Sequence, residues 1–442
     1  MEMVSRRLAT PRRPRRRLLG LAVTVGLVMA IILLLVEVMT ISASRKELRA
    51  ECDALEAYLD AVAIERDAWR NAYDSITASF NRSRSEYWYL EGMPPTYLIY
   101  LDGGTCSAEN VVNGEVEFRD PDAATVIQSA IAALPTGGGK ILLRPGTYLL
   151  STSLRDGGRD FVLLQGEGWN TTLKISDNVS RTVIDLSGRT GWAMLDLAID
   201  GNKAHNAQRP GGVPMDMNQN GIHFFQVTHS KILRCYIHDT VMHGINIHYQ
   251  STDNLVADCR VEGCGTPGDY GASAGILVFS NSSRNEVRRC RCIDNFARGI
   301  YVSARSNNCT ISENLITGGR TEAAQGIIVM DGCQGVGLHN NTIHDVPGNG
   351  IDVGNRYGPA YAEITIRGNT ITKTGSSGIW CGSGGVDVTI TDNHVAKAGS
   401  YAISALGARS RIVNNCIYAT EDLAILSEGP DSDVSGNSIY PP

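Results

Sequence analysis

Short alternations of apolar and polar residues fill the C-terminal half of the chain. Isoleucine and valine alternate with polar residues over four or five positions, a period of two that is typical of β-strands. The alternation belongs to a repeat: an apolar residue, two residues, Asn or Cys, one residue, then a second apolar residue. Its central positions, 22 to 31 residues apart, are Cys235, Cys259, Cys290, Asn314, Asn341, Asn369, Asn393, Asn415 and Asn437. A repeat of roughly 20 to 50 residues built from short strands predicts a solenoid.

A second repeated element lies between these units. It is a glycine, or late in the chain an alanine, followed by isoleucine: Gly221, Gly244, Gly275, Gly299, Gly326, Gly350, Gly378, Ala402 and Ala424. Parallel stacking would place equivalent residues about 4.8 Å apart, so the asparagines should form a hydrogen-bonded ladder. The three cysteines would continue this ladder as small apolar residues. We therefore expect mostly buried thiols.

The segment before the repeats contains one predicted helix. Residues 122–134 place Ala124, Ile127, Ile131 and Leu134 on one face, and Asp122 is a suitable N-cap. Such a helix would cover the first edge of the stacked sheets, so we assign 121–442 to the solenoid and its capping helix. Residues 91–120, with several Gly and Pro turn signals, are predicted to form a linker with a small hairpin.

The N-terminus carries a long apolar run behind a basic tail. Residues 1–17 include seven arginines, and 18–41 are apolar over nearly the length that a membrane-spanning helix needs. This pattern predicts a cytoplasmic tail, one transmembrane helix and a body outside the cell or in the periplasm. A cleaved signal peptide is the alternative, since small residues follow at 42–44.

Residues 44–85 show heptad spacing. Leu48, Leu55, Val62, Trp69 and Ile76 share one seam position, which predicts a coiled-coil stalk and a homo-oligomer, either dimer or trimer. A single amphipathic helix lying on the membrane surface or on the chain's own body is the alternative.

Composition and charge narrow the class of protein. The 442 residues include 47 glycines, which favours many turns and short strands. The formal net charge is -6 although the tail is strongly basic, so the remaining chain is more acidic still. We therefore exclude nucleic acid as a partner of the body.

Three stretches resemble the opening of pectate-lyase-superfamily proteins: Asp122–Ile131, Gly137–Tyr148 and Leu164–Gly168. Residues 220–440 resemble the repeats of the same superfamily. The resemblance implies an all-β fold, a right-handed single-stranded parallel β-helix. It does not specify an activity, because lyases, glycoside hydrolases, epimerases and phage tailspikes share this fold.

In proteins of this superfamily the strand that begins with Gly-Ile lines an outer groove for sugar chains. Alternation directs the residues two and four positions after each glycine outward. Aromatic and hydrogen-bonding side chains there suit pyranose rings. The candidates for substrate binding are Phe225, Asn246, Phe279 and Trp380, together with His243 and Arg298. The candidates for catalysis are His223, His248, Tyr301, Arg305 and Asp352.

The segment Gly244-Ile-Asn-Ile-His248-Tyr-Gln is similar to the Gly-Phe-Asp-Pro-His-Glu-Gln stretch of mannuronan C5-epimerases and related alginate lyases. The resemblance implies that His248 is catalytic, but Asn246 replaces the family's aspartate and His243 its tyrosine. Such enzymes remove the proton next to a uronate carboxylate, and Tyr301, Arg298 and Arg305 could act as acid and charge stabilisers. A calcium ion (Ca2+) could also stabilise the enolate, although the sequence defines no set of ligands for it.

Two functions follow as hypotheses. The first is a membrane-anchored surface protein that binds or modifies polysaccharide, with a uronate lyase or epimerase-like activity if it is an enzyme. The second is a non-enzymatic envelope or adhesion protein on an oligomeric stalk. His238-Asp239 and His344-Asp345 follow the repeat and are predicted to be hydrogen-bonding pairs at corners.

Overall fold

The computed structural model describes residues 92–206, 219–267, 273–355, 360–419 and 421–441. The basic tail, transmembrane helix and coiled-coil stalk predicted for 1–17, 18–41 and 44–85 lie outside these ranges and remain predictions. Within the described ranges no helix has the length and apolar character to cross a membrane. The chain divides into the compact units Met1–Thr77 and Ala78–Pro442, and all described residues belong to the second.

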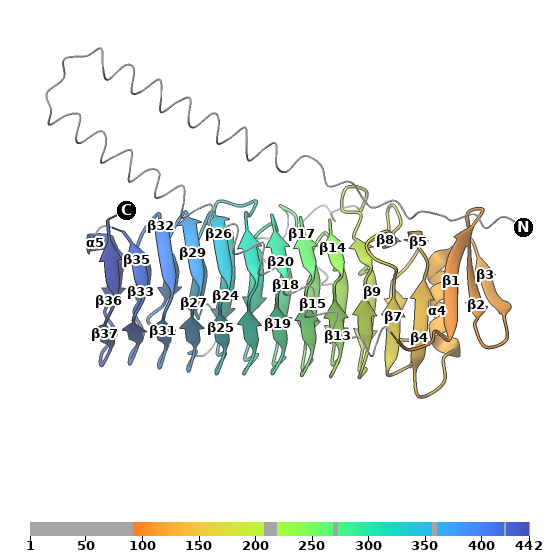
Figure 1. The fold of residues 1–442 in the computed structure, drawn as a ribbon, viewed down its shortest axis with the longest axis horizontal. Helices are drawn as coiled ribbons and strands as arrows, with labels where there is room; N and C mark the ends of the chain where they lie inside the picture. The colour runs from red at the N-terminus through yellow and green to blue at the C-terminus, as the bar shows by residue number, and fades with distance from the viewer. Residues whose placement is uncertain (1–91, 207–218, 268–272, 356–359, 420, 442) are drawn as a thin grey trace, which may run out of the picture. The chain divides into compact units, whose positions relative to one another are not determined.

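The described part of the second unit contains three sheets, here called A, B and C (Figure 1). Sheet A has 15 strands, in the order β3 (Glu115–Asp120), β2 (Thr105–Asn110), β1 (Tyr97–Asp102), β4 (Gly139–Leu143), β7 (Val162–Gln165), β10 (Ala193–Leu195), β13 (Lys231–Leu233), β16 (Leu255–Ala257), β19 (Glu286–Arg288), β22 (Thr310–Ser312), β25 (Gly337–His339), β28 (Thr365–Arg367), β31 (Thr389–Thr391), β34 (Arg411–Val413) and β37 (Asp433–Ser435). Sheet B has 12 strands: β5 (Gly146–Leu150), β8 (Thr171–Ile175), β11 (Ala198–Asp200), β14 (Tyr236–His238), β17 (Arg260–Glu262), β20 (Arg291–Ile293), β23 (Leu315–Thr317), β26 (Thr342–Val346), β29 (Thr370–Thr374), β32 (His394–Ala398), β35 (Cys416–Tyr418) and β38 (Ser438–Tyr440). Sheet C has 11: β6 (Leu154–Arg155), β9 (Ile184–Ser187), β12 (Ile222–Phe225), β15 (Ile245–His248), β18 (Ile276–Phe279), β21 (Arg298–Val302), β24 (Gln325–Met330), β27 (Ile351–Gly354), β30 (Ile379–Cys381), β33 (Ile403–Ala405) and β36 (Ile425–Ser427).

The strands from β4 onward pair in parallel with the equivalent strand of the next coil, which confirms the predicted parallel β-solenoid. From β4 to β36 each coil contributes one strand to each sheet, and the last coil contributes β37 and β38 to sheets A and B. Every second side chain of a strand points into the solenoid, and these apolar side chains fill its interior. In β12, Ile222 and Phe224 point into the core and are at most 1% exposed, whereas His223 and Phe225 point away from it. The short hydrophobic alternations of the sequence therefore encode both the sheets and the side from which a site can be built.

The predicted asparagine ladder is present. Asn341 donates from Nδ2 to Asn369 Oδ1 at 3.0 Å, and Asn369 donates in the same way to Asn393 at 2.9 Å. The ladder ends at Asn437, and Cys235, Cys259 and Cys290 continue it toward the N-terminus as buried thiols. Nine of the ten cysteines within the described ranges are buried and all ten are free, as expected.

Two helices occur in the described ranges, α4 (Ala123–Ala133) and α5 (Glu421–Ala424). Asp122 caps α4 by accepting from the backbone N–H groups of Ala124 and Thr125, and Ile127 and Ile131 are fully buried. A linker with a small hairpin was predicted for 91–120, and the described part of this segment contains such a hairpin as part of a sheet. β1, β2 and β3 form an antiparallel meander, and β1 pairs in parallel with β4, so this segment extends sheet A.

Candidate functional site

The outward side of sheet C carries two rows of side chains in register. The first outward row runs through Asp185, His223, Asn246, Leu277, Tyr301, Ile328, Asp352 and Trp380. The second outward row contains Ser187, Phe225, His248 and Phe279. Alternation therefore places the predicted outward residues as expected.

The first outward row is less open than the sequence suggested. His223 is 9% exposed, Asn246 is 0% exposed and Asp352 is 4% exposed. In the second row Phe225, His248 and Phe279 are half-buried. On β12 and β15 the solvent-accessible part of this face is therefore formed by the second row, whereas Asp185, Tyr301 and Trp380 of the first row are also half-buried.

His223 is held by a carboxylate on the preceding coil. Its Nδ1 lies 3.0 Å from Oδ1 of Asp185, and the two side chains are 11% and 26% exposed. Burial alone would raise the pKa of Asp185, but the hydrogen bond and charge of His223, with the charge of Arg155, outweigh burial and lower that pKa. Asp185 is therefore ionised at neutral pH, and its Oδ1 accepts a hydrogen bond from the N–H group at Nδ1 of His223.

His248 lies in a group of aromatic rings. Its ring centroid is 5.8 Å from that of His223, 5.9 Å from Phe225 and 5.6 Å from Phe279. Tyr249, at the end of the strand, is 41% exposed and stacks on Phe225 at 4.9 Å with 7° between the planes. Burial and the charge of His223 lower the pKa of His248, so its imidazole is neutral near pH 7.

His243 is buried just before β15. Its Nδ1 accepts the backbone N–H of Ala274 at 3.0 Å, so its ring proton is on Nε2. Burial, together with the charges of Arg298, His223 and His248, lowers the pKa of His243 to about 3. The imidazoles of His223, His243 and His248 thus lie close together, and burial lowers the pKa of His243 and of His248.

Arg298 and Tyr301 form a second group two coils away from β15. The guanidinium carbon of Arg298 lies 4.6 Å from the ring centroid of Tyr301, a cation–π contact. Burial raises the pKa of Tyr301, which keeps its phenol protonated. Arg305 lies beyond the end of β21, in an exposed corner with φ of 61°, and is not on this face of the sheet.

Asp352 and Trp380 form a third group. Oδ2 of Asp352 accepts from Gln325 Nε2 and, at 3.0 Å, from Asn349 Nδ2. The Trp380 ring lies close against the backbone of Gly354 and Gly382, where a Cβ would meet ring atoms at 3.0 and 2.7 Å. These glycines therefore leave room for a flat aromatic side chain on the sheet.

The structure brings together His223, Phe225, His243, Asn246, His248 and Phe279. It does not bring Asp352 to them, because four strand pairings separate β15 from β27, roughly 19 Å at about 4.8 Å for each coil. Leu277 and Ile328, both buried, occupy the row between the three groups. Asp185 and Tyr249 were not among the predicted site residues, and the strand of Asp185 lacks the Gly-Ile signal.

Within the described ranges, one group of side chains has the spacing of metal ligands. The ligand atoms of Asp200, His238 and Asp239 lie within 4.8 Å of one another on sheet B and its corner. Lys174 already forms an ion pair with Asp200 at 2.7 Å, and the charges of Lys203 and Arg320 act on Asp239. These cations already balance the carboxylates, so the group fits a bound calcium ion poorly.

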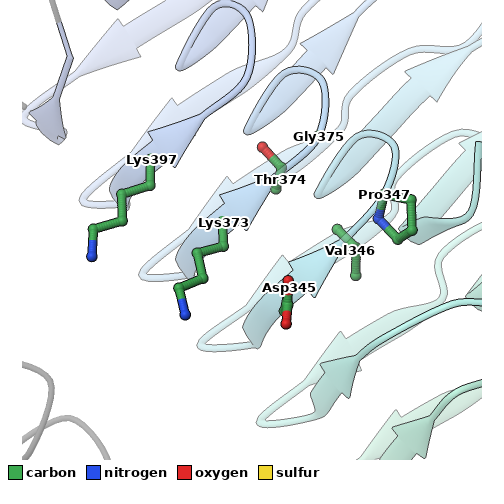
Figure 2. A pocket seen from close by; sticks show the side chains of 7 residues that line it. All are labelled: Asp345, Val346, Pro347, Lys373, Thr374, Gly375 and Lys397. Carbon is green, nitrogen blue, oxygen red and sulfur yellow. The ribbon is translucent and has the colours of Figure 1, made fainter. Parts of the chain in front are cut away.

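A hollow of about 380 Å³ lies at another corner of the solenoid (Figure 2). It is lined by Asp345, Val346, Pro347, Lys373, Thr374, Gly375 and Lys397. Figure 2 shows Asp345, Lys373 and Lys397 as a row on successive coils. The lining contains no imidazole and no aromatic ring, so the outward side of sheet C is the better candidate site.

Comparisons with known proteins agree with this architecture. Residues 161–333 and 325–440 match the model of the right-handed beta helix region. No curated protein matches the chain in sequence. The A-module of mannuronan C-5 epimerase AlgE6 from Azotobacter vinelandii aligns with a TM-score of 0.59 and 18% identity, over 72% of this chain and 95% of that chain. The A-module of AlgE4 from the same organism gives 0.54 and 20%, over 73% and 94%.

A phage tailspike protein also shares the fold. The tailspike of Escherichia coli bacteriophage HK620, solved with a pentasaccharide, aligns with a TM-score of 0.55 and 13% identity, over 74% of this chain and 65% of that chain. At such identities the likeness concerns the fold, which carbohydrate-active enzymes and tailspikes have in common. The family match spans most of the solenoid, and the chain belongs to the right-handed β-helix family.

Proposed function

We propose that the chain binds a uronate-containing polysaccharide on the outward side of sheet C and acts on it by proton abstraction, as a lyase or C5-epimerase. One observation carries the proposal. Imidazoles that are neutral near pH 7 lie beside the stacked rings of Phe225 and Tyr249, on a face that runs across successive coils. Stacked rings can hold a sugar face while a neutral imidazole accepts a proton.

In the proposed reaction a base takes the proton from C5 of a uronate residue, and the electron pair of the broken C–H bond passes into the carboxylate to give an enolate. Arg298, whose charge acts on His243, is the cation that would stabilise the enolate. Return of a proton to the opposite face inverts C5. Loss of the C4 oxygen, which leaves with a proton, instead gives an unsaturated sugar.

We further propose that residues 1–85 hold this body at the cell surface through the transmembrane helix 18–41 and the stalk 44–85. The polysaccharide would then be an extracellular or periplasmic one. This part of the proposal rests on the sequence pattern alone.

The test is incubation of the full chain with a panel of uronate polymers, with and without calcium. Ultraviolet absorbance detects new unsaturated ends, and NMR detects inverted residues. We expect one of the two products, and its loss in His248→Ala. Absence of both products with every polymer would contradict the catalytic proposal.

The burial of His223, Asn246 and Asp352 favours a second candidate, a binding protein without catalysis. Asn246, which stands where epimerases have an aspartate, supports it further. Retained binding on a glycan array, without any product, would establish this function.

A further inference from the structure

One ring nitrogen of His223 has a hydrogen-bond partner, and the other has none within the described part of the chain. Nδ1 faces the ionised Asp185 and therefore carries a proton, so in the neutral imidazole of His223 the lone pair is on Nε2. Nε2 is buried and has no hydrogen-bond partner within the described part of the chain. His223 as a whole is 9% exposed.

A buried hydrogen-bond acceptor without a partner lowers the stability of the fold, and such acceptors are rare in native proteins. A poorly placed ring does not explain this one, because the bond to Asp185 and the neighbouring rings of Phe225 and His248 fix the position of the His223 ring. The lone pair is thus held in place inside the candidate site.

The neighbouring His243 has the opposite arrangement. Ala274 donates to its Nδ1, so its Nε2 carries a proton. His248 has no carboxylate partner within the ranges that the structure describes, so nothing seen there fixes its tautomer. Of the three imidazoles, His223 alone is oriented by a carboxylate and offers a bare nitrogen.

We infer that Asp185 is a positioning residue, which fixes the tautomer of His223 so that Nε2 accepts a proton from the bound sugar. This inference rests on the proposed function and deepens it. In the reaction, the C5 proton passes to Nε2, the C5–H electron pair enters the uronate carboxylate, and Asp185 stabilises the imidazolium that forms. In a protein that only binds sugar, Nε2 accepts a hydrogen bond from a sugar hydroxyl.

The test combines a spectroscopic and a kinetic measurement on the full chain labelled with ¹⁵N-histidine. The nine histidines are compared in wild type, Asp185→Asn and Asp185→Ala, with Asp239→Asn as the matched control on a second histidine–aspartate pair with the same 3.0 Å distance. Wild-type His223 should show protonated Nδ1 and bare Nε2. Both Asp185 variants should shift the proton toward Nε2, while Asp239→Asn leaves the His223 signals unchanged.

With a uronate polymer that is turned over, Asp185→Asn should lower kcat roughly 10²- to 10⁴-fold with little change in KM, whereas Asp239→Asn should stay within about twofold of wild type. With a polymer that only binds, adding its oligosaccharide should shift the His223 Nε2 resonance in wild type and not in Asp185→Ala.

The role of Asp185 and the proposed function can be disproved independently of each other. An unchanged His223 tautomer in both Asp185 variants, or an unchanged kcat in an active protein, overturns the role of Asp185 and leaves the proposed function standing. Absence of turnover with a ligand-induced shift at His223 Nε2 removes the catalytic proposal and keeps the acceptor. Absence of any oligosaccharide-induced shift at Nε2 overturns the acceptor role.

Discussion

Two histidine–aspartate pairs lie on different sheets of the solenoid with the same Nδ1 to Oδ distance, 3.0 Å. Asp185 and His223 come from successive coils on sheet C, and their side chains are 26% and 11% exposed. His238 and Asp239 are neighbours in the chain, and the Asp239 side chain, in a corner with φ of 49°, is 53% exposed.

The surroundings separate the two pairs. His238 stacks on Tyr236 at 4.5 Å, and its aspartate lies near Lys203 and Arg320. His223 instead faces aromatic rings and a second imidazole, with a bare nitrogen. The hydrogen bond between histidine and aspartate therefore does not define a site by itself. What the second ring nitrogen meets decides whether the pair can act on a ligand.

The largest difference is expected in turnover. His223→Ala should lower kcat on a uronate polymer roughly 10²- to 10⁴-fold, because it removes the proton acceptor. His238→Ala should leave kcat within about twofold. Initial rates of product formation measure both, and equal losses in the two variants would break the distinction between the pairs.

The next effect concerns acid stability. The pKa of His243 is lowered to about 3, so between pH 6.5 and 3 the unfolded chain binds more protons at this residue than the folded chain. Its contribution to the unfolding free energy is complete above pH 6.5 and is lost as the pH falls toward 3. His243→Gln keeps an acceptor for the N–H of Ala274 but cannot titrate. In this variant the unfolding free energy should therefore fall less between pH 6.5 and 3 than in wild type, by on the order of several kcal/mol.

Urea titrations across this pH range measure the decline. His394→Gln on sheet B is the matched variant, because burial also lowers the pKa of His394 but the side chain is only half-buried. His394→Gln should reduce the acid-induced loss of unfolding free energy less than His243→Gln does. Identical pH slopes in wild type and His243→Gln would contradict the role given to burial.

Much of the fold could be predicted from sequence because it depends on local pattern. The alternation identified the strands, and the repeat placed Asn314 to Asn437 in one ladder. The antiparallel meander β1–β3 was missed as part of sheet A because pairing between β1 and β4 joins residues about forty positions apart.

The site was harder to predict because it depends on contacts between coils. Asp185 and His223 are 38 residues apart, and no motif links them. His238 pairs with Asp239 as expected, and His344 contacts Oγ1 of Thr372 on the next coil at 2.7 Å, a contact that adjacency in the sequence does not indicate. Burial of the first outward row follows from packing along the face, which alternation cannot reveal.

A smaller contrast is expected in folding stability. Asp185→Ala leaves His223 with a buried ring nitrogen that has lost its partner, which should lower the unfolding free energy by about 1–3 kcal/mol. Asp239→Ala removes an exposed partner and should cost about 0–1 kcal/mol. Urea unfolding at pH 7 compares them, and a larger loss for Asp239→Ala would reverse the assignment of the buried and exposed pair.

The smallest contrast tests the aromatic rings beside the two pairs. Tyr249 on the sheet C side and Trp169 on the sheet B side are similarly exposed, 41% and 46%, and each packs on a second ring, Phe225 or Tyr236. If the sugar lies on sheet C, Tyr249→Ala should weaken oligosaccharide binding by about threefold to tenfold, the effect of losing one stacking ring. Trp169→Ala should leave the affinity unchanged. Calorimetric titration decides, and a loss confined to Trp169→Ala would move the binding face to sheet B, beside the ion-paired histidine rather than the bare one.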